Sequence, residues 1–168
     1  ESYMVGALAR FNINHNLLHP RAKSAAQELG LKPICINPYL NTAAQVVEIV
    51  HCVEDAIRIC DELIARGIQN EPLFKFAGRG GEGAGSAEVP RGILFHNYQI
   101  GDDGRVVGAN CIIPTGQNLA NIEADMRALV PQILDQGEDK VRMMMEMLVR
   151  AYDPCISCST HFMNVRFV

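Results

Sequence analysis

The sequence has 168 residues, 48% of them hydrophobic and 20% charged, with a formal net charge of −4. This length and composition are typical of one globular domain, or a large piece of one, and exclude a disordered tail. The small net charge, with acids and bases interleaved, argues against nucleic acid or an anionic membrane surface as a partner. No apolar run approaches the roughly 20 residues of a membrane helix, and six cysteines are too few for a disulfide-dense secreted scaffold. We therefore expect reduced thiols, a reducing compartment and no direct membrane insertion.

The first 77 residues are predicted to be mainly helical. Residues 19–30 predict a short helix, and a connector rich in proline follows it. Residues 41–67 predict a long amphipathic helix that begins at a capping box of Thr42 and Gln45 and ends at Gly67. Its apolar stripe is expected to face the core and consists of Val46, Val50, Val53, Ile57, Cys60 and Ile64.

The second half is predicted to have a different character. Residues 78–90 are rich in glycine and are expected to form a loop; their G-x-G-x-x-G pattern lacks the helix that a dinucleotide-binding motif must open. Residues 91–114 predict a β-hairpin, because β-forming residues flank an Asp-Gly turn signal. Residues 115–152 predict two helices, the first with Asn118 as its N-cap and an interruption near Pro131. The expected fold class is α+β, mainly α, with long amphipathic helices and a small β-hairpin sheet.

Several isolated residues have ordinary structural interpretations. Cys35, Cys52 and Cys60 each stand alone, which favours a small buried apolar side chain at each position. His51 lies among acidic residues on the polar side of the long helix, so a solvated surface histidine is expected. The methionines of residues 143–147 have helical spacing and favour core packing over a thioether metal site.

The segment "DPCISCSTH" is different in kind. Asp153 precedes a proline, which favours an extended backbone, so the preceding helix should end there and both cysteines should lie on a turn or loop. Cys155 and Cys158 can face one metal ion, and His161 can reach the same ion or a neighbouring one. A redox pair is disfavoured because no βαβ pattern precedes it, and a structural zinc site would lack a fourth ligand. On spacing alone, a metal site, a zinc half-site and chance all stay open.

The same segment resembles the D-P-C-x-x-C-x-x-H signature that closes the large subunit of nickel–iron hydrogenases. Three further segments resemble that family and occur in its order: "YMVGALARFN", "GEGAGSAEVPRG" and "NCIIPTGQNLANIEADMR". The wording "PTGQNLANIE" is more similar to the cytoplasmic, multi-subunit branch, because membrane-linked relatives tend to have a tryptophan there. The resemblance spans nearly the whole chain and implies a fragment of the hydrogenase large-subunit fold in the cytoplasm.

The resemblance also implies a set of metal ligands. The family holds a buried nickel–iron centre with four cysteine thiolates, carries carbon monoxide and cyanide on the iron, and has a magnesium or iron ion nearby. Cys155 matches the terminal nickel ligand of the closing motif, and Cys158 matches a thiolate that bridges nickel and iron. His161 matches a ligand of the nearby ion, and Cys111 matches the position whose backbone carbonyl serves that ion.

Further residues match the surroundings of the centre. Arg91 matches a guanidinium held over the two metals, and Asp153 matches the carboxylate beside it. Pro90 and Thr115 match positions that line the pocket of the iron's diatomic ligands, with the Thr115 hydroxyl as a donor to cyanide. Heterolytic cleavage of dihydrogen needs a Lewis-acidic metal pair and a nearby base, so the implied catalytic residues are Arg91, Asp153 and Cys155.

The sequence also departs from the family pattern. The other two family cysteines belong to an R-x-C-x-x-C motif, and no such motif occurs in this sequence. We therefore expect the chain to be the C-terminal part of a large subunit, to be inactive alone and to carry no nickel–iron centre by itself. Residues 153–161 would form the metal-ligand motif. Residues 162–168 would be either a tail that is removed on maturation or a shortened end of the chain.

The implied activity is the reversible splitting of H2 into protons and electrons. The implied partners are an iron–sulfur small subunit, a maturation endopeptidase and nickel-insertion proteins. One alternative is a structural zinc module built from Cys155, Cys158 and His161, but it leaves Arg91 and Asp153 unexplained. Another is a relative of the quinone-site subunit of respiratory complex I, whose members lack the nickel cysteines.

Overall fold

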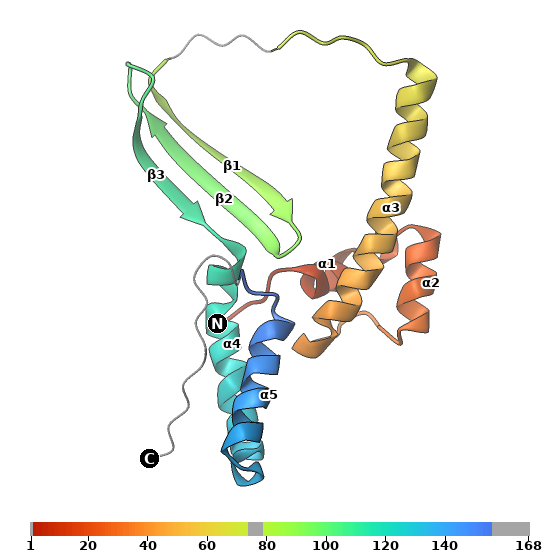
Figure 1. Cartoon of the computed structure of the whole chain (residues 1–168). Coiled ribbons are helices and arrows are strands. Elements are labelled where there is room, and N and C mark those ends of the chain that lie inside the picture. Colours follow the sequence, from red (N-terminus) through yellow and green to blue (C-terminus); the bar gives the residue numbers. More distant parts are fainter. Residues whose placement is uncertain (1, 74–78, 156–168) are drawn as a thin grey trace.

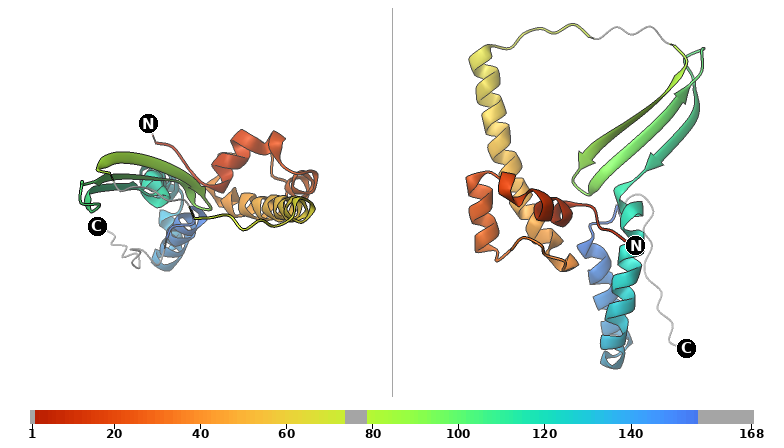
Figure 2. Two further views of the ribbon diagram at one scale, coloured as in Figure 1. Left: turned by 90° about the horizontal axis from the view of Figure 1, so that it is seen from above. Right: turned by 180° about the vertical axis from the view of Figure 1, so that it is seen from behind.

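The computed structural model describes residues 2–73 and 79–155, and the statements below concern that part of the chain. Three arms extend from a common centre: a long helix, a three-stranded sheet and a pair of packed helices (Figure 1). The same arrangement is visible from behind and from above (Figure 2). Within the described residues, no helix is both long and apolar enough to cross a bilayer. The architecture confirms the expected α+β, mainly α, fold class.

Three helices form the first cluster. Helix α1 (Ala7–Asn14) and helix α2 (Pro20–Glu28) pack against the first half of helix α3 (Asn41–Arg66). Helix α2 confirms the predicted short helix, and α3 ends at Gly67, which has a φ of +76° as expected of a helix stop. Alanines are prominent in the core and allow the helices to approach closely. The buried residues of this cluster are Ala7, Leu8, Phe11, Ala22, Ala26, Leu31, Ala44 and Val47.

The second half of α3 is not covered by the described residues. The apolar stripe has the predicted periodicity, but Val53 and Ile64 on it are 53% and 75% exposed. Cys52 and Cys60 are exposed as well, so the prediction that they are buried is wrong, while Cys35 is half-buried. The reason is that α1 and α2 pack only on the first turns of α3, whereas its later turns extend away from them (Figures 1 and 2).

The start of α3 differs from the predicted capping box. The helix begins at Asn41 with no side-chain cap, and the amide of Gln45 donates instead to Asp153 Oδ2 at 3.0 Å. Asn41 is buried; its Oδ1 accepts from the Leu8 N–H and its Nδ2 donates to the Ala151 carbonyl, both at 3.0 Å. These polar groups bind distant parts of the chain, so tertiary contacts replace the local cap that the capping-box pattern suggested.

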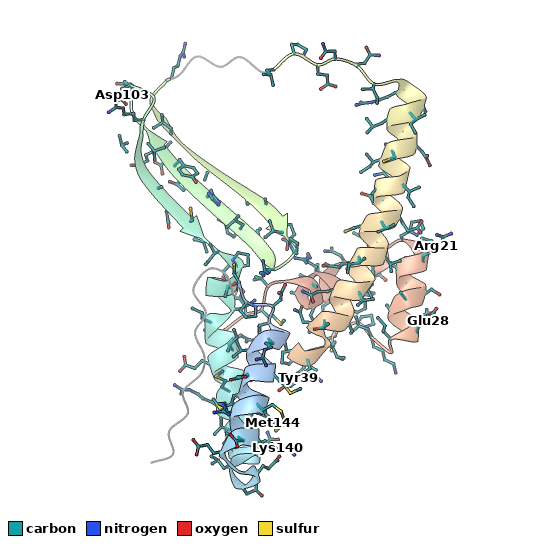
Figure 3. The ribbon with its side chains drawn as sticks, in the orientation of Figure 1. Arg21, Glu28, Tyr39, Asp103, Lys140 and Met144 are labelled. Atoms are coloured by element: carbon teal, nitrogen blue, oxygen red, sulfur yellow. The ribbon has the colours of Figure 1, made fainter. Side chains whose placement is uncertain are left out.

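The sheet contains a strand that the sequence did not predict. Strands β1 (Gly81–Val89), β2 (Gly92–Ile100) and β3 (Val106–Ile112) are antiparallel in the order β1-β2-β3. The predicted hairpin is confirmed as β2 and β3, and its turn residue Asp103 lies at the end of the sheet far from the helices (Figure 3). The prediction of a loop over residues 78–90 is wrong for β1. Although glycine makes this segment flexible, β1 pairs with β2 along its whole length, and this pairing satisfies its backbone hydrogen-bonding groups.

The remaining helices pack together as a second cluster. Helix α4 (Pro114–Leu129) begins four residues before the predicted N-cap, and Asn118 is instead buried inside it. It ends before Pro131, as predicted. Helix α5 (Glu138–Ala151) runs back along α4 with Lys140 and Met144 near its lower end (Figure 3). The core of this cluster consists of Ile122, Leu148 and Tyr152.

The methionine run lies on α5. Met143 and Met147 are about half exposed, so the prediction of core packing is wrong for these two side chains. The buried face of α5 is formed by Val141, Leu148 and Ala151 instead. Met4, near the N-terminus, packs against both clusters and so connects them.

Candidate functional site

The predicted site residues within the described part of the chain lie mainly where the three arms meet. Four segments that are distant in sequence contribute: the N-terminal segment before α1, the turn between β1 and β2, the start of α4 and the residues after α5 (Figure 1). We call this place the junction and define it by Val5, Arg91, Thr115, Asp153 and Cys155. Cys158 and His161 lie outside the described residues.

Arg91 is held at the end of the sheet. Pro90 and Arg91 are the two residues that connect β1 to β2, since Val89 pairs with Gly92. The Arg91 Nε donates to the Asp153 carbonyl at 3.0 Å and lies 3.5 Å from Asp153 Oδ1. The guanidinium and the carboxylate are therefore in contact, as the resemblance implies.

Asp153 has an unusual backbone conformation. Its φ is +51°, in the left-handed region, whereas a residue before proline was expected to be extended. Its N–H donates to the Arg150 carbonyl at 2.9 Å, which closes the end of α5, and Gln45 holds its carboxylate. Such a backbone costs about 1–3 kcal/mol and persists where neighbouring contacts fix it. Sequence reasoning missed Gln45 because the capping-box pattern accounted for it.

Thr115 contacts the backbone of the cysteine motif. The Cys155 N–H donates to Thr115 Oγ1 at 3.3 Å, and both residues are half-buried. Because a hydroxyl group can accept and donate at the same time, this contact leaves the Thr115 O–H able to donate elsewhere. Thr115 is in the first turn of α4, so the start of that helix and the end of α5 are placed together.

Cys111 belongs to a different contact group. It lies on β3 opposite His96 of β2, with its Sγ 3.5 Å from His96 Nδ1. The same nitrogen is 2.8 Å from the Tyr98 hydroxyl, and charge on the Cys111 thiol is the main cause that raises the pKa of Tyr98. No feature of the sequence pattern singled out His96 or Tyr98; only the strand register brings them to Cys111.

Asn118 anchors the N-terminal segment at the junction. The side chain is almost fully buried; its Oδ1 accepts from the Val5 N–H at 2.8 Å and its Nδ2 donates to the Val5 carbonyl at 3.2 Å. Val5 in turn lies directly against Gly92, at the start of β2. The Asn118 amide therefore fixes the N-terminal segment on α4, and the Val5 side chain packs that segment against the sheet.

Tyr152, just before Asp153, is buried in a polar network. Its hydroxyl donates to Asp125 and accepts from Asn121 Nδ2 at 2.7 Å. Burial, followed by the hydrogen bond to Asp125, raises the pKa of Tyr152 well above its ordinary value of 10.0, and the bond from Asn121 opposes this shift. Tyr39, which lies beside the upper part of α5, also has a raised pKa, through burial and then the charge of Asp125 (Figure 3). The network holds the end of α5 against α4.

Replacing Tyr152 with phenylalanine is expected to lower the free energy of unfolding by about 1.5–3 kcal/mol at neutral pH, the usual contribution of a hydrogen bond to a charged group. Because the folded pKa is raised, this contribution is complete below about pH 10 and is lost as the pH rises above it. Urea unfolding between about pH 8 and pH 11 should show the two proteins converging. Tyr3→Phe, at an exposed tyrosine, is the control, and a difference that stays constant with pH would contradict the assignment.

The donor set fits part of a nickel–iron site. Within residues 2–73 and 79–155, no three His, Cys, Asp or Glu side chains are grouped as metal ligands. Cys155 lies at the junction, and the soft sulfur of Cys155 and Cys158 is the donor chemistry that nickel and iron accept in thiolate sites. A four-thiolate centre requires two more cysteines than this motif contains.

A pocket lies behind the β1–β2 turn. It has a volume of about 640 Å³ and lies between α1, α3 and the end of β1, with Phe11, Val47 and Pro90 in its wall. Pro90 is the predicted site residue that lines it. Its lining is mainly apolar and includes Arg10.

The family is decided by comparison with known proteins. The model of the nickel-dependent hydrogenase family matches residues 1–161. The chain belongs to this family. The hydrogenase relatives include the alpha subunit of sulfhydrogenase 1 from Pyrococcus furiosus, 36% identical over 163 residues, and the beta subunit of the NAD-reducing hydrogenase HoxS from Cupriavidus necator, 34% identical over 170 residues.

The match covers nearly all of this chain but a minor part of the hydrogenase relatives. It covers 97% of the chain and 38% of the Pyrococcus subunit, and 95% of the chain and 34% of the Cupriavidus subunit. A crystal structure of an NAD+-reducing [NiFe]-hydrogenase in the H2-reduced state matches with a TM-score of 0.73 and 29% identity, over 95% of this chain and 36% of that one. The hydrogenase large-subunit fold expected from the sequence is confirmed for the aligned region.

Proposed function

We propose that the chain is the C-terminal part of the large subunit of a cytoplasmic, multi-subunit nickel–iron hydrogenase, and that it takes part in the reversible splitting of H2. The observation that carries the proposal is the junction itself. Arg91 contacts Asp153, and Thr115 contacts the backbone of Cys155, two residues further on. These residues come from three separate parts of the sequence, within a chain that belongs to the hydrogenase family.

The metal ligands follow from the motif. Cys155 and Cys158 would hold the nickel–iron centre together with two thiolates from outside this chain, and carbon monoxide and cyanide would be bound to its iron. When bound, the centre supplies a Lewis-acidic metal pair that takes up dihydrogen. His161 and the backbone carbonyl of Cys111 would serve a magnesium or iron ion. Cys158 and His161 enter this proposal from the sequence alone.

The protein residues supply charge and a base. Arg91 places a fixed positive charge at the junction, and contacts with the Asp153 carbonyl and carboxylate orient its guanidinium. Preorganised donors of this kind stabilise charge that develops during the reaction without a reorganisation cost. The Cys155 thiolate would accept the proton, while the Thr115 hydroxyl and Pro90 would line the pocket of the iron's diatomic ligands.

The proposed partners follow from the same assignment. The large subunit would pass electrons to an iron–sulfur small subunit, and nickel-insertion proteins would load the metal. A maturation endopeptidase would remove residues 162–168 after His161. A structural zinc module is not proposed, because the family match extends far beyond the cysteine motif.

The proposal is tested by producing the large subunit that contains these 168 residues together with its small subunit. We expect stoichiometric nickel by elemental analysis and H2-dependent reduction of a viologen dye. The 168-residue chain purified alone serves as the control and should contain less than stoichiometric nickel and show no activity, because two thiolate ligands are missing. A nickel-free, inactive complex would overturn the proposed function, and stoichiometric zinc in its place would favour the zinc module.

A further inference from the structure

Arg10 of α1 makes a dense set of contacts at the back of the junction. Its Nε and Nη2 donate to the two carboxylate oxygens of Glu48 on α3, both at 2.6 Å. The side chains of Arg10 and Glu48 are only 19% and 23% exposed, so this is a partly buried, two-pronged ion pair. Such a pair fixes the plane of the guanidinium as well as its position.

The other N–H groups of Arg10 bind the residues immediately before Arg91. Nη1 donates to Glu88 Oε1 at 2.5 Å and to the Val89 carbonyl at 2.9 Å, and Nη2 donates to the Pro90 carbonyl at 2.8 Å. Together with the two bonds to Glu48, these contacts with described residues use each N–H of the guanidinium. Arg10 therefore joins α3 to the last three residues that precede Arg91.

The turn that carries Arg91 is held by these bonds. Two-residue hairpin connections usually have positive φ at one or both central residues, and proline cannot adopt positive φ. Neither Pro90 nor Arg91 has a positive φ in this structure. Pro90 and Gly92 occupy the second and fourth positions of the turn, where ordinary β-turns favour proline and glycine. The bonds from Arg10 to the carbonyls of Val89 and Pro90 hold the first two residues of this turn in place.

The backbone of Arg91 is confined from the opposite side. Gly6 has a φ of +116°, and a Cβ placed on it would lie 3.2 Å from the Arg91 carbonyl oxygen. Arg10 and Gly6 belong to the same segment, four residues apart, and that segment is anchored by Asn118 through Val5. The start of α1 and the residues before it thus contact the Pro90–Arg91 turn through both Arg10 and Gly6.

We propose that Arg10 is a positioning residue that orients Arg91 over the metal site by fixing the Pro90–Arg91 turn to α3. This inference rests on the proposed function, because it assigns Arg10 an effect on the reaction through Arg91. Lysine in place of Arg10 keeps the positive charge but has three donors instead of five and no planar fork, so it cannot reproduce the two-pronged bond to Glu48 together with the bonds to Glu88, Val89 and Pro90. A substitution that loosens a supporting contact of a metal site usually lowers activity by about 10- to 100-fold.

The test compares Arg10→Lys with Arg21→Lys in the assembled enzyme. Arg21 also pairs with a glutamate of α3, Glu54 at 2.7 Å, but it lies on α2, away from the turn between β1 and β2 (Figures 1 and 3). We expect Arg10→Lys to lower H2-dependent dye reduction per nickel atom by about 10- to 100-fold with unchanged nickel content. Its thermal midpoint should fall, because partly buried hydrogen bonds of the guanidinium are lost. Arg21→Lys should behave like the unmodified enzyme. If Arg10→Lys fails to assemble, Glu48→Gln replaces it in the comparison, because it removes the charge and one of the two acceptors of the same anchor.

A double-mutant cycle separates positioning from a general structural role. In an enzyme that already carries Arg91→Lys, adding Arg10→Lys should change the rate by less than about twofold, because the group that it positions is gone. Multiplicative effects, or a normal rate in Arg10→Lys beside a slow Arg91→Lys, would overturn the inference and leave the proposed function intact. A normal rate in Arg91→Lys would instead count against the role of Arg91 in the proposed function.

Discussion

Replacing Arg91 with lysine in the assembled enzyme is expected to slow H2-dependent dye reduction by about 10²–10³-fold, the usual cost of removing a preorganised donor. Lysine retains the charge, but its ammonium group is a point charge and cannot reproduce the planar guanidinium, whose Nε lies close to both the carbonyl and the carboxylate of Asp153. Nickel content should not change, because Arg91 is not a proposed ligand. The measurement is the rate per nickel atom, so incomplete loading cannot imitate the effect.

Arg127→Lys is the matched control for this prediction. Arg127 forms an exposed ion pair with Glu123 one turn earlier on α4, at 2.6 Å, and contacts of that kind contribute little. Its rate per nickel should equal that of the unmodified enzyme. Full activity in Arg91→Lys with complete nickel loading would remove Arg91 from the set of catalytic residues.

Replacing Gly92 with alanine is expected to have the largest effect on folding. A Cβ on Gly92 would lie 2.5 Å from Val5 Cγ2 and 2.8 Å from Val5 Cβ, and the φ of +138° is one that alanine rarely adopts. Overpacking costs about 1–3 kcal/mol and the strained backbone a further 1–3 kcal/mol or so, which gives a loss of about 2–6 kcal/mol in the free energy of unfolding. Urea unfolding followed by circular dichroism measures it.

Gly85→Ala supplies the control, since a Cβ there meets no atom within 4 Å and the backbone of β1 is extended. It should leave the stability unchanged within about 0.5 kcal/mol. Adding Val5→Ala to Gly92→Ala removes the atom at 2.5 Å and should restore part of the loss, although the backbone strain remains. Equal stability of Gly92→Ala and Gly85→Ala would show that the close approach of Val5 to the sheet is not essential.

Local patterns predicted the elements that local chemistry controls. The period of the apolar residues identified α3 and its stop at Gly67, Pro131 marked the end of α4, and the Asp-Gly signal marked the turn between β2 and β3. The resemblance supplied Arg91 and Asp153, whose contact the structure contains. Each of these features depends on residues close together in sequence or on a motif of known order.

Features that depend on distant partners were not predictable. Strand β1 is glycine-rich and forms because β2 pairs with it, and the exposed stripe of α3 has the same periodicity as a buried one. Gln45 resembled a cap but binds Asp153 across the fold. The contact of Cys111 with His96 required the register of two strands. In each case the sequence contains the chemical group but not the identity of its partner.

The way in which the junction is closed has a consequence for the order of folding. Asn118 binds Val5 across 113 residues of chain, and Asn41 binds the Ala151 carbonyl across 110. Contacts of such separation carry a high entropic cost of loop closure, so they form after local helices and hairpins. During synthesis from the N-terminus, α1 to α3 can assemble first, while Arg91 acquires its Asp153 partner only after the end of α5 has been made. The junction, where the metal is proposed to bind, is therefore among the last parts of this chain to fold.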